Sequence, residues 1–324
     1  MPTDATELMP GDFIEVRSAT EILATLNEDG ALEGLPFMPE MLPFCGGRFR
    51  VYRRAHKTCD TIEWTGLRGM DRVVHLDMLR CDGSAHGGCQ AGCLFFWKEA
   101  WLKPLDAHTS ERGDAAGHVP AIDSAADAWL RERAATDGAA RYRCQATELH
   151  RATYPLSVFA PKQYACDVRA NGATWWQVLS AIAVSTYNRF LRAMNRPAYP
   201  RTVGRLVKTP CEQLGLQAGE WVEVKSHAEI LATLDAQGKN RGLTFDPEMV
   251  PYCGQRFRVL RRVSKLIDEK TGELRSIPGD CIILDGVVCR ALYHRLCPRS
   301  TYPYWREIWL RRVEAGDAPR RSER

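Results

Sequence analysis

The chain has 324 residues, of which 45% are hydrophobic and 26% charged, and its formal net charge is +4. These values are typical of a soluble globular protein with two or three domains. No run of about 18 apolar residues occurs, which excludes a membrane-spanning helix, and the acidic opening "MPTDATELMPGDFIEV" excludes a secretory signal. The sequence therefore predicts a cytoplasmic protein, whose modest charge permits a nucleic-acid or protein partner without requiring one.

Short strands and one capped helix are predicted in the first hundred residues. The segment "DFIEVR" alternates polar and apolar residues, which indicates a strand. Ser18 lies three residues before Glu21, a capping box that opens a short helix, which Gly30 can end. The segment "PFMPEMLPFCGG" is a proline-broken turn, and three further strands are predicted in "RFRVYRR", "VVHLDML" and "LFFWKEAWLKPL".

A different composition marks residues 106–218 as a helical connector. The segment "HTSERGDAAGH" is a polar linker, and "SAADAWLRERAA" is a helix with Ser124 as its cap. The segment 174–194, "TWWQVLSAIAVSTYNRFLRAM", is interrupted by Gln177, Asn188 and Arg189. It therefore predicts a buried amphipathic helix rather than a membrane span, and we expect it to pack on the domains on either side.

The last third of the chain repeats the first third. "GDFIEVRSATEILATLNEDG" begins at Gly11, and "GEWVEVKSHAEILATLDAQG" begins at Gly219. From Gly11 to Arg54, 26 of 44 positions are identical to those 208 residues further along, without a gap, and the similarity continues to "FWKEAWL" and "YWREIWL". The chain is therefore an internal duplication, with a first cysteine-rich repeat at 1–105 and a second repeat plus a basic tail at 219–324.

Each repeat combines four or five short strands with one inserted helix, which is typical of a small SH3-like β-barrel. The predicted fold is mainly β with α, in which two SH3-like barrel units are joined by the helical connector. The opening "PGDFIEV" and the closing "AWLKPL" are similar to the first and last strands of KOW and nitrile-hydratase β-subunit barrels. As a whole, the chain resembles a bacterial family of duplicated, cysteine-rich SH3/KOW-like proteins, which implies two barrels and no particular activity.

Cysteines and a histidine recur in the same frame in both repeats. The pairs related by the shift of 208 are Cys45 and Cys253, Cys81 and Cys289, His86 and His294, and Cys89 and Cys297, whereas Cys93 aligns with Thr301. The chain has twelve cysteines and no export signal. In a reducing compartment, such clusters more often bind a metal than form disulfides.

Barrel topology predicts that these groups meet. Strands 48–57 and 72–81 should form a hairpin with its turn near "EWTG", so that the thiols of one repeat gather at one end of its barrel. The predicted metal ligands are Cys45, Cys81, His86, Cys89 and Cys93 in the first repeat, and Cys253, Cys289, His294 and Cys297 in the second. Because Thr301 replaces a thiol, we expect a closed first site and a second site with a weaker fourth ligand.

The sequence leaves the cofactor open between zinc and an iron–sulfur cluster, since thiolates and imidazole suit both. Core thiols and loop histidines that bind nothing are the alternative interpretation. Cys144 and Cys166 are candidates for a nucleophile or an additional ligand. The cysteines to which the sequence assigns no role are Cys59, Cys144, Cys166, Cys211 and Cys281.

Two other patterns allow a functional or a structural interpretation. Tryptophans flank a glutamate in "WKEAWL" and "WREIWL", where they could line a ligand pocket or pack in the core under the connector helix, with the glutamate paired to an arginine. Arginines alternate with apolar residues in "RFRVYRR" and "RFRVLRR", which suits either nucleic acid or a solvated strand face.

Three functions follow from these patterns, and they leave open whether the protein is an enzyme. The first is a metal-binding accessory or scaffold protein that holds zinc or an iron–sulfur cluster. The second is an iron–sulfur enzyme or electron carrier. The third is a KOW-like nucleic-acid binder. No P-loop, no G-x-S-x-G and no H-E-x-x-H motif occurs to favour another chemistry.

Overall fold

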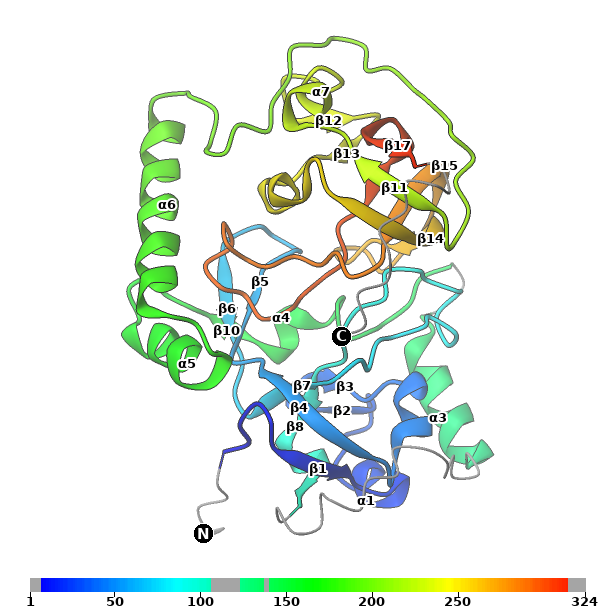
Figure 1. The fold of residues 1–324 in the computed structure, drawn as a ribbon. Helices are drawn as coiled ribbons and strands as arrows, with labels where there is room; N and C mark the ends of the chain where they lie inside the picture. The colour runs from blue at the N-terminus through cyan, green and yellow to red at the C-terminus, as the bar shows by residue number, and fades with distance from the viewer. Residues whose placement is uncertain (1–6, 106–122, 137–139, 314–324) are drawn as a thin grey trace. The chain divides into compact units, whose positions relative to one another are not determined.

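A computed structural model describes residues 7–105, 123–136 and 140–313 (Figure 1). The strands form several small antiparallel sheets, and helices and strands occupy similar shares of the described residues, so that β structure does not predominate as predicted. The chain divides into two compact units. The first comprises Met1–Val178, Lys265–Arg275 and Cys297–Arg299, and the second comprises Leu179–Ser264, Ser276–Leu296 and Ser300–Arg324.

Five strands of the first repeat form one open antiparallel sheet in the order β8-β7-β4-β1-β9. In the described residues no pairing joins the edge strands β8 and β9, so the sheet is not closed into a barrel. The elements in chain order are β1 (Phe13–Val16), α1 (Ala19–Leu23), β2 (Ala31–Leu32), β3 (Leu35–Pro36), the 3-10 helix η1 (Pro39–Phe44), β4 (Arg48–Arg54), β5 (Lys57–Cys59), β6 (Leu67–Gly69), β7 (Val73–Leu76), β8 (Trp97–Lys98), the 3-10 helix η2 (Glu99–Trp101) and β9 (Leu102–Pro104).

Local signals in the sequence explain where these elements begin and turn. The capping box of α1 is confirmed, because Ser18 Oγ accepts the N–H of Glu21 and the Glu21 carboxylate accepts the N–H of Ser18 at 3.0 Å. The predicted hairpin of strands 48–57 and 72–81 is confirmed by the antiparallel pairing of β4 with β7, and β5 pairs with β6 nearer the turn at "EWTG". The predicted strand 94–105 is broken by η2, which separates β8 from β9.

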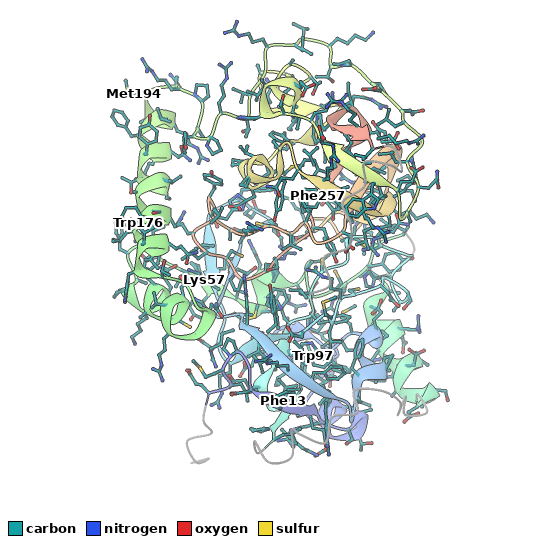
Figure 2. The ribbon with its side chains drawn as sticks, viewed as in Figure 1. Phe13, Lys57, Trp97, Trp176, Met194 and Phe257 are labelled. Atoms are coloured by element: carbon teal, nitrogen blue, oxygen red, sulfur yellow. The ribbon has the colours of Figure 1, made fainter. Side chains whose placement is uncertain are left out.

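The tryptophans of "WKEAWL" belong to the core of the first repeat. Trp97 and Trp101 are fully buried, and their rings meet that of Phe37 edge-on, with centroids 6.3 and 5.2 Å apart (Figure 2). The intervening Glu99 pairs with the buried Arg54 at 2.9 Å. Of the two interpretations of this motif, core packing with an ion-paired glutamate is therefore confirmed.

The connector contains four helices and one short strand in the described residues. They are α3 (Ser124–Ala134), α4 (Leu149–Ala152), β10 (Tyr154–Pro155), α5 (Pro161–Asn171) and α6 (Trp175–Ala193). The cap of α3 is Asp123 rather than Ser124, because the Asp123 carboxylate accepts the N–H groups of Ala125 and Ala126. The polar linker predicted at 108–118 and the basic tail "APRRSER" lie outside the described residues.

The prediction of a buried helix at 174–194 is wrong in one respect. The helix forms as α6, but its large apolar side chains are exposed, and the buried ones are the smaller Val178, Ala181 and Leu191. Hydrophobic periodicity identifies the apolar face of a helix but not what covers that face. Among the described helices, none is long and apolar enough to cross a membrane.

The second repeat has the same elements displaced by 208 residues, except that one strand takes the positions of both β4 and β5, and the next strand those of both β6 and β7. Its sheet has the order β16-β15-β14-β11-β17. The elements are β11 (Trp221–Val224), α7 (His227–Leu231), β12 (Lys239–Asn240), β13 (Leu243–Thr244), the 3-10 helix η3 (Pro247–Tyr252), β14 (Arg256–Ile267), β15 (Leu274–Leu284), β16 (Trp305–Arg306), the 3-10 helix η4 (Glu307–Trp309) and β17 (Leu310–Arg312). Only β14 and β15 are longer than their counterparts, and their adjoining ends, Lys265–Arg275, belong to the first unit.

Candidate metal centre

The loop "RCDGSAHGGCQAGC" folds tightly on itself. Its ends are closed by the pairing of Arg80 with Leu94 and by the bond from the N–H of Cys81 to the carbonyl of Cys93, 2.8 Å. Within it, Gly83 has φ +77°, and a Cβ at this position would lie 2.1 Å from the carbonyl oxygen of Cys89. In this loop a side chain would clash there, so the glycine at this position allows the chain to bring Cys89 back toward Cys81.

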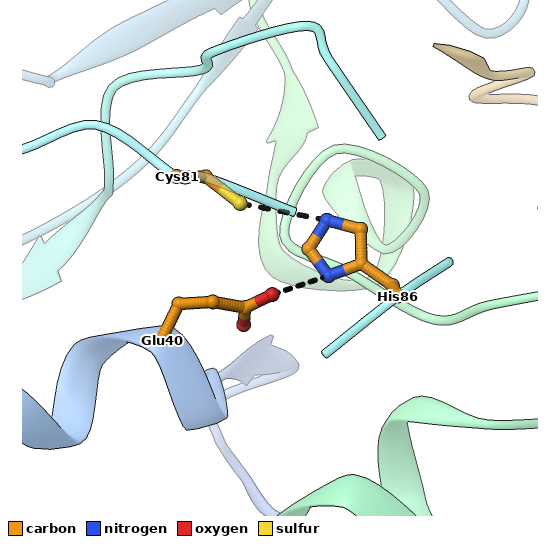
Figure 3. A group of neighbouring side chains, drawn as sticks. All are labelled: Glu40, Cys81 and His86. Carbon is orange, nitrogen blue, oxygen red and sulfur yellow. Dashed lines mark hydrogen bonds and ion pairs between the residues drawn. The ribbon is translucent and has the colours of Figure 1, made fainter. Parts of the chain in front are cut away.

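Three buried or half-buried side chains, those of Glu40, Cys81 and His86, lie next to one another at this loop (Figure 3). The Cys81 Sγ lies 3.4 Å from Nε2 of His86, and the other ring nitrogen, Nδ1, lies 2.8 Å from Oε1 of Glu40. Glu40 comes from η1, and the same Oε1 accepts the N–H of Ala85 at 2.8 Å. The carboxylate thus fixes both the loop and the imidazole ring, with Nε2 directed at the thiol.

This geometry suits a metal ion between Cys81 and His86. Zn–S is about 2.3 Å and Zn–N about 2.0–2.1 Å, so a tetrahedral angle separates sulfur and nitrogen by about 3.6 Å. The observed 3.4 Å is close to that value. Metal-bound histidines also commonly donate their second N–H to a carboxylate, which is the position of Glu40.

Further thiols line a cavity at the same place. The cavity has a volume of about 40 Å³, and about 10–15 Å³ suffices for one water-sized sphere. Its walls contain the predicted ligands Cys81, His86, Cys89 and Cys93, together with Cys144 from the connector. Four thiols and one imidazole therefore surround a space that can hold a single ion.

Burial keeps these thiols protonated when no cation is present. It raises the pKa of Cys93 to about 11 and that of Cys144 to about 12. The pKa of Cys81 is raised even further above its usual range, first by burial and then by the nearby Glu40 carboxylate and Cys93. A bound cation would reverse this, because coordination stabilises the thiolate.

Cys45, the remaining predicted ligand of the first repeat, lies in the hydrophobic core rather than in the cavity wall. Burial alone raises its pKa to about 12. Among the described residues, the only groups of three ligand atoms within 4.8 Å of one another are Glu40–Cys81–His86 and Glu248–Cys289–His294. Neither group contains Cys45 or Cys89, although we expected both thiols to gather with Cys81.

Cys297 has a different partner from the one that the sequence suggested. It belongs to the first unit, where its Sγ accepts the N–H of Cys59 at 3.1 Å. Its pKa is lowered to about 6, chiefly by a hydrogen bond from the Cys59 thiol, which outweighs burial. In the second unit, Glu248 rather than Cys297 completes the group of three ligand atoms.

The second group has looser geometry than the first. The Cys289 Sγ lies 3.8 Å from His294, and here the facing ring nitrogen is Nδ1 rather than Nε2. The Nε2 of His294 lies 3.6 Å from a carboxylate oxygen of Asp246. The buried Glu248 accepts the N–H of Tyr293, as Glu40 accepts that of Ala85, and burial raises the pKa of Glu248.

The loop of the second repeat retains the backbone of the first without its glycines. The four glycines of the first loop, Gly83, Gly87, Gly88 and Gly92, all have positive φ, between +62° and +77°. The aligned residues Ala291, Arg295, Leu296 and Ser300 also have positive φ, between +45° and +61°. Each side chain in this conformation costs about 1–3 kcal/mol, and such strain persists where the surrounding structure holds the loop in place.

Sequence reasoning missed the two glutamates and the position of Cys144. Glu40 and Glu248 are identical under the 208-residue shift and follow a proline in both turns, "MPEM" and "DPEM". An acid that recurs in an otherwise apolar turn is the signal that could have identified them, because a buried carboxylate needs a partner. No family model, no curated protein and no solved structure matches this chain.

Proposed function

We propose that the first repeat binds one Zn²⁺ through Cys81, His86 and two of the three thiols of Cys89, Cys93 and Cys144. The observation that carries this proposal is the 3.4 Å separation of the Cys81 and His86 donor atoms, beside a cavity lined by the other thiols. Glu40 acts as the outer partner that orients the imidazole. None of these three thiols lies within 4.8 Å of both the Cys81 and the His86 ligand atoms, so two of them must move toward the ion to complete the four ligands of a closed structural site.

Zinc fits this cavity better than an iron–sulfur cluster. The volume of about 40 Å³ accommodates one ion, whereas a [4Fe–4S] cluster brings eight atoms into the same space. A histidine ligand with a carboxylate behind it is also a common arrangement in zinc sites. The iron–sulfur enzyme or electron carrier therefore becomes the alternative that a spectrum must exclude.

For the whole protein, we propose an accessory or scaffold role in a reducing, intracellular compartment. All twelve cysteines lie in the described residues and none is in a disulfide, which suits such a compartment. We further propose that each repeat is an SH3-like unit of the KOW-like kind suggested by the resemblance. The return of the last strand to the edge of the first, in the order β8-β7-β4-β1-β9, supports this.

The zinc proposal is tested by metal analysis of anaerobically purified full-length protein, followed by exchange of the metal for Co²⁺. We expect zinc without visible colour, and after exchange the tetrahedral Co²⁺ bands with sulfur-to-cobalt charge transfer. A brown protein containing iron and sulfide would establish the cluster instead. Protein that neither retains zinc nor takes up Co²⁺ would overturn the proposal.

A second candidate function is a thiol nucleophile, because Cys81, His86 and Glu40 are arranged as nucleophile, base and orienting acid. The raised pKa of Cys81 opposes it, since the thiolate is the reactive form. Alkylation of metal-free protein with iodoacetamide separates the two functions. A nucleophile predicts rapid labelling of Cys81 that His86→Ala abolishes, whereas a structural zinc site predicts slow labelling in both proteins.

The alternating arginines of "RFRVYRR" and "RFRVLRR" give less support to nucleic-acid binding as the function. Arg54 is buried and paired with Glu99, and Arg48 pairs with Glu15 at 3.6 Å. In the second repeat, Arg262 pairs with Glu307 at 2.5 Å. Because carboxylates neutralise the charge of these arginines, they contribute little to binding phosphates. Binding to mixed RNA and DNA that weakens steeply with salt would revive this candidate.

A further inference from the structure

We propose that α6 binds the surface of an anionic membrane through its exposed apolar face, independently of the metal centre. Its large exposed side chains are Trp175, Trp176, Leu179, Ile182, Tyr187 and Phe190, and Met194 follows directly after its last residue; all are between 37% and 76% exposed. Figure 2 labels Trp176 and Met194, near the two ends of the helix. Exposed apolar surface that runs along a whole helix marks an interaction site.

These side chains form one continuous face rather than scattered contacts. At about 100° per residue, Ile182, Trp175, Leu179, Phe190 and Trp176 follow one another around the helix within about 120°. Every charged residue of α6 lies outside this arc, and the helix contains no acidic residue. The opposite side holds the buried Val178 and Ala181, so the exposed face is the one that remains available to a partner.

The charge around the helix identifies the partner as anionic. Between Asp167 and Glu212 the sequence has no acidic residue. The same segment has seven basic residues, Arg169, Arg189, Arg192, Arg196, Arg201, Arg205 and Lys208. On the helix itself, Arg189 follows Ile182 at the edge of the apolar face, where a guanidinium can meet headgroups while the ring side chains enter the interface.

The composition of the face favours a lipid surface over a second protein chain. Tryptophan, tyrosine and phenylalanine beside arginine are typical of helices that lie in the membrane interface. A helix that crosses the membrane is excluded for the described residues, so α6 would lie flat on the surface. The polar Asn188 does not interrupt the face, because it is bonded to the N–H and the carbonyl of Tyr199 at 2.6 and 2.8 Å.

The test is flotation of the full-length protein with vesicles of phosphatidylcholine, with and without phosphatidylglycerol. We expect binding to the anionic vesicles only, a blue shift of tryptophan fluorescence, and weaker binding at high salt. Leu179→Glu combined with Trp176→Glu should lower the partition coefficient at least about tenfold. Trp64→Glu is the matched control, because Trp64 is equally exposed but lies in the β5–β6 loop, and it should bind as the unchanged protein does.

Three results would overturn this proposal. The first is equal binding of the unchanged protein and the double variant to anionic vesicles. The second is a dimer in multi-angle light scattering that Leu179→Glu dissociates, which would assign the face to a second copy of the chain. The third is RNA or DNA binding that the double variant loses while vesicle binding is absent in both proteins. Retention of zinc by the double variant would show that the fold and the metal site are unaffected.

Discussion

The two repeats share one backbone frame but differ in the groups that they place around it. In the first, Cys81 and His86 lie beside a cavity that three further thiols line. In the second, Cys289 and His294 are 3.8 Å apart, and carboxylates of Glu248 and Asp246 are their neighbours. The second site is therefore poorer in sulfur and richer in oxygen, which favours a weaker or a different metal.

The two loops share positive φ values but differ in where their thiols lie. Leu296 and Arg295 retain the positive φ of the glycines with which they align, despite the cost to a side chain. Of the three cysteines of the first loop only Cys93 is replaced, by Thr301, but Cys297 bonds to Cys59 in the first unit. A loop that keeps a strained conformation and the pair Cys289 and His294 supports a second site that still binds.

The largest expected effect comes from removing the central thiol of each site. Cys81→Ala should remove the metal of the first repeat, because it deletes the thiol that lies beside the His86 imidazole. We expect the zinc affinity to fall by more than the roughly 100-fold typical of outer-shell changes. Cys289→Ala should affect only the second site. Metal analysis after dialysis against a chelator measures both.

Cys45→Ala is the matched control for these variants. It also deletes a thiol of the repeated frame, but from the core, so it should cost about 1–2 kcal/mol of unfolding free energy and leave metal content unchanged. Loss of zinc in Cys45→Ala would restore Cys45 as a ligand. Retention of zinc in Cys81→Ala would exclude the first site as described.

Much of the backbone structure of the repeats was predictable because it depends on interactions between residues close in sequence. The capping box of Ser18 and Glu21 needs only four consecutive positions, and the β5–β6 hairpin needs only a turn between two short strands. The glycines of the loop also indicated a tight fold, which the φ of +77° at Gly83 confirms. Interactions between residues close in sequence are those that a pattern can specify.

The site was less predictable because its partners are distant in sequence. Cys144 reaches the cavity from the connector, and Cys59 meets Cys297 across 238 residues. Cys45 differs for another reason, since a small thiol is equally suited to a core and to a metal. The face of α6 illustrates the same limit, because periodicity located its apolar residues and could not say that Trp176 is exposed.

The pH dependence of zinc binding should distinguish the two sites by a smaller effect than the loss of a ligand. The thiols of the first site have pKa values raised by burial, to about 11 for Cys93 and about 12 for Cys144, so a metal must displace their protons near neutrality. Zinc affinity should therefore rise with pH, by about three log units per pH unit for three thiolates in the first site. For Cys289 alone the slope should be about one.

Chelator competition at several pH values around neutrality measures these slopes, with Cys81→Ala isolating the second site and Cys289→Ala the first. Equal slopes would mean that the sites have the same number of thiolates. In that case the contrast between sulfur and oxygen donors would be wrong. A zinc affinity that does not rise with pH through neutrality would exclude thiol ligands.

Smaller effects are expected from Glu40, which orients His86 without being a ligand. Glu40→Ala should lower the zinc affinity of the first site by about 10–100-fold. Glu40→Gln should lower the zinc affinity less, because the amide oxygen of glutamine can still accept the imidazole N–H. The Co²⁺ spectrum of the first site should keep its charge-transfer bands in both variants. A changed set of bands would instead make Glu40 a ligand, and Glu248→Ala should leave the first site untouched.

The smallest effects test whether the two loops share a strained backbone. Gly88 has φ +75° with open space around a potential Cβ, so Gly88→Ala should cost about 1 kcal/mol through the backbone alone. Leu296 occupies the same position in the second loop with φ +61°. Leu296→Gly and Leu296→Ala both remove the apolar contacts of the leucine side chain. The glycine variant should therefore have the higher free energy of unfolding, by about 1 kcal/mol. Urea unfolding of the metal-free proteins measures both differences. If Leu296→Ala were as stable as Leu296→Gly while Gly88→Ala was destabilised, the second loop would have relaxed away from the first, and the positive φ values would not reflect a retained site.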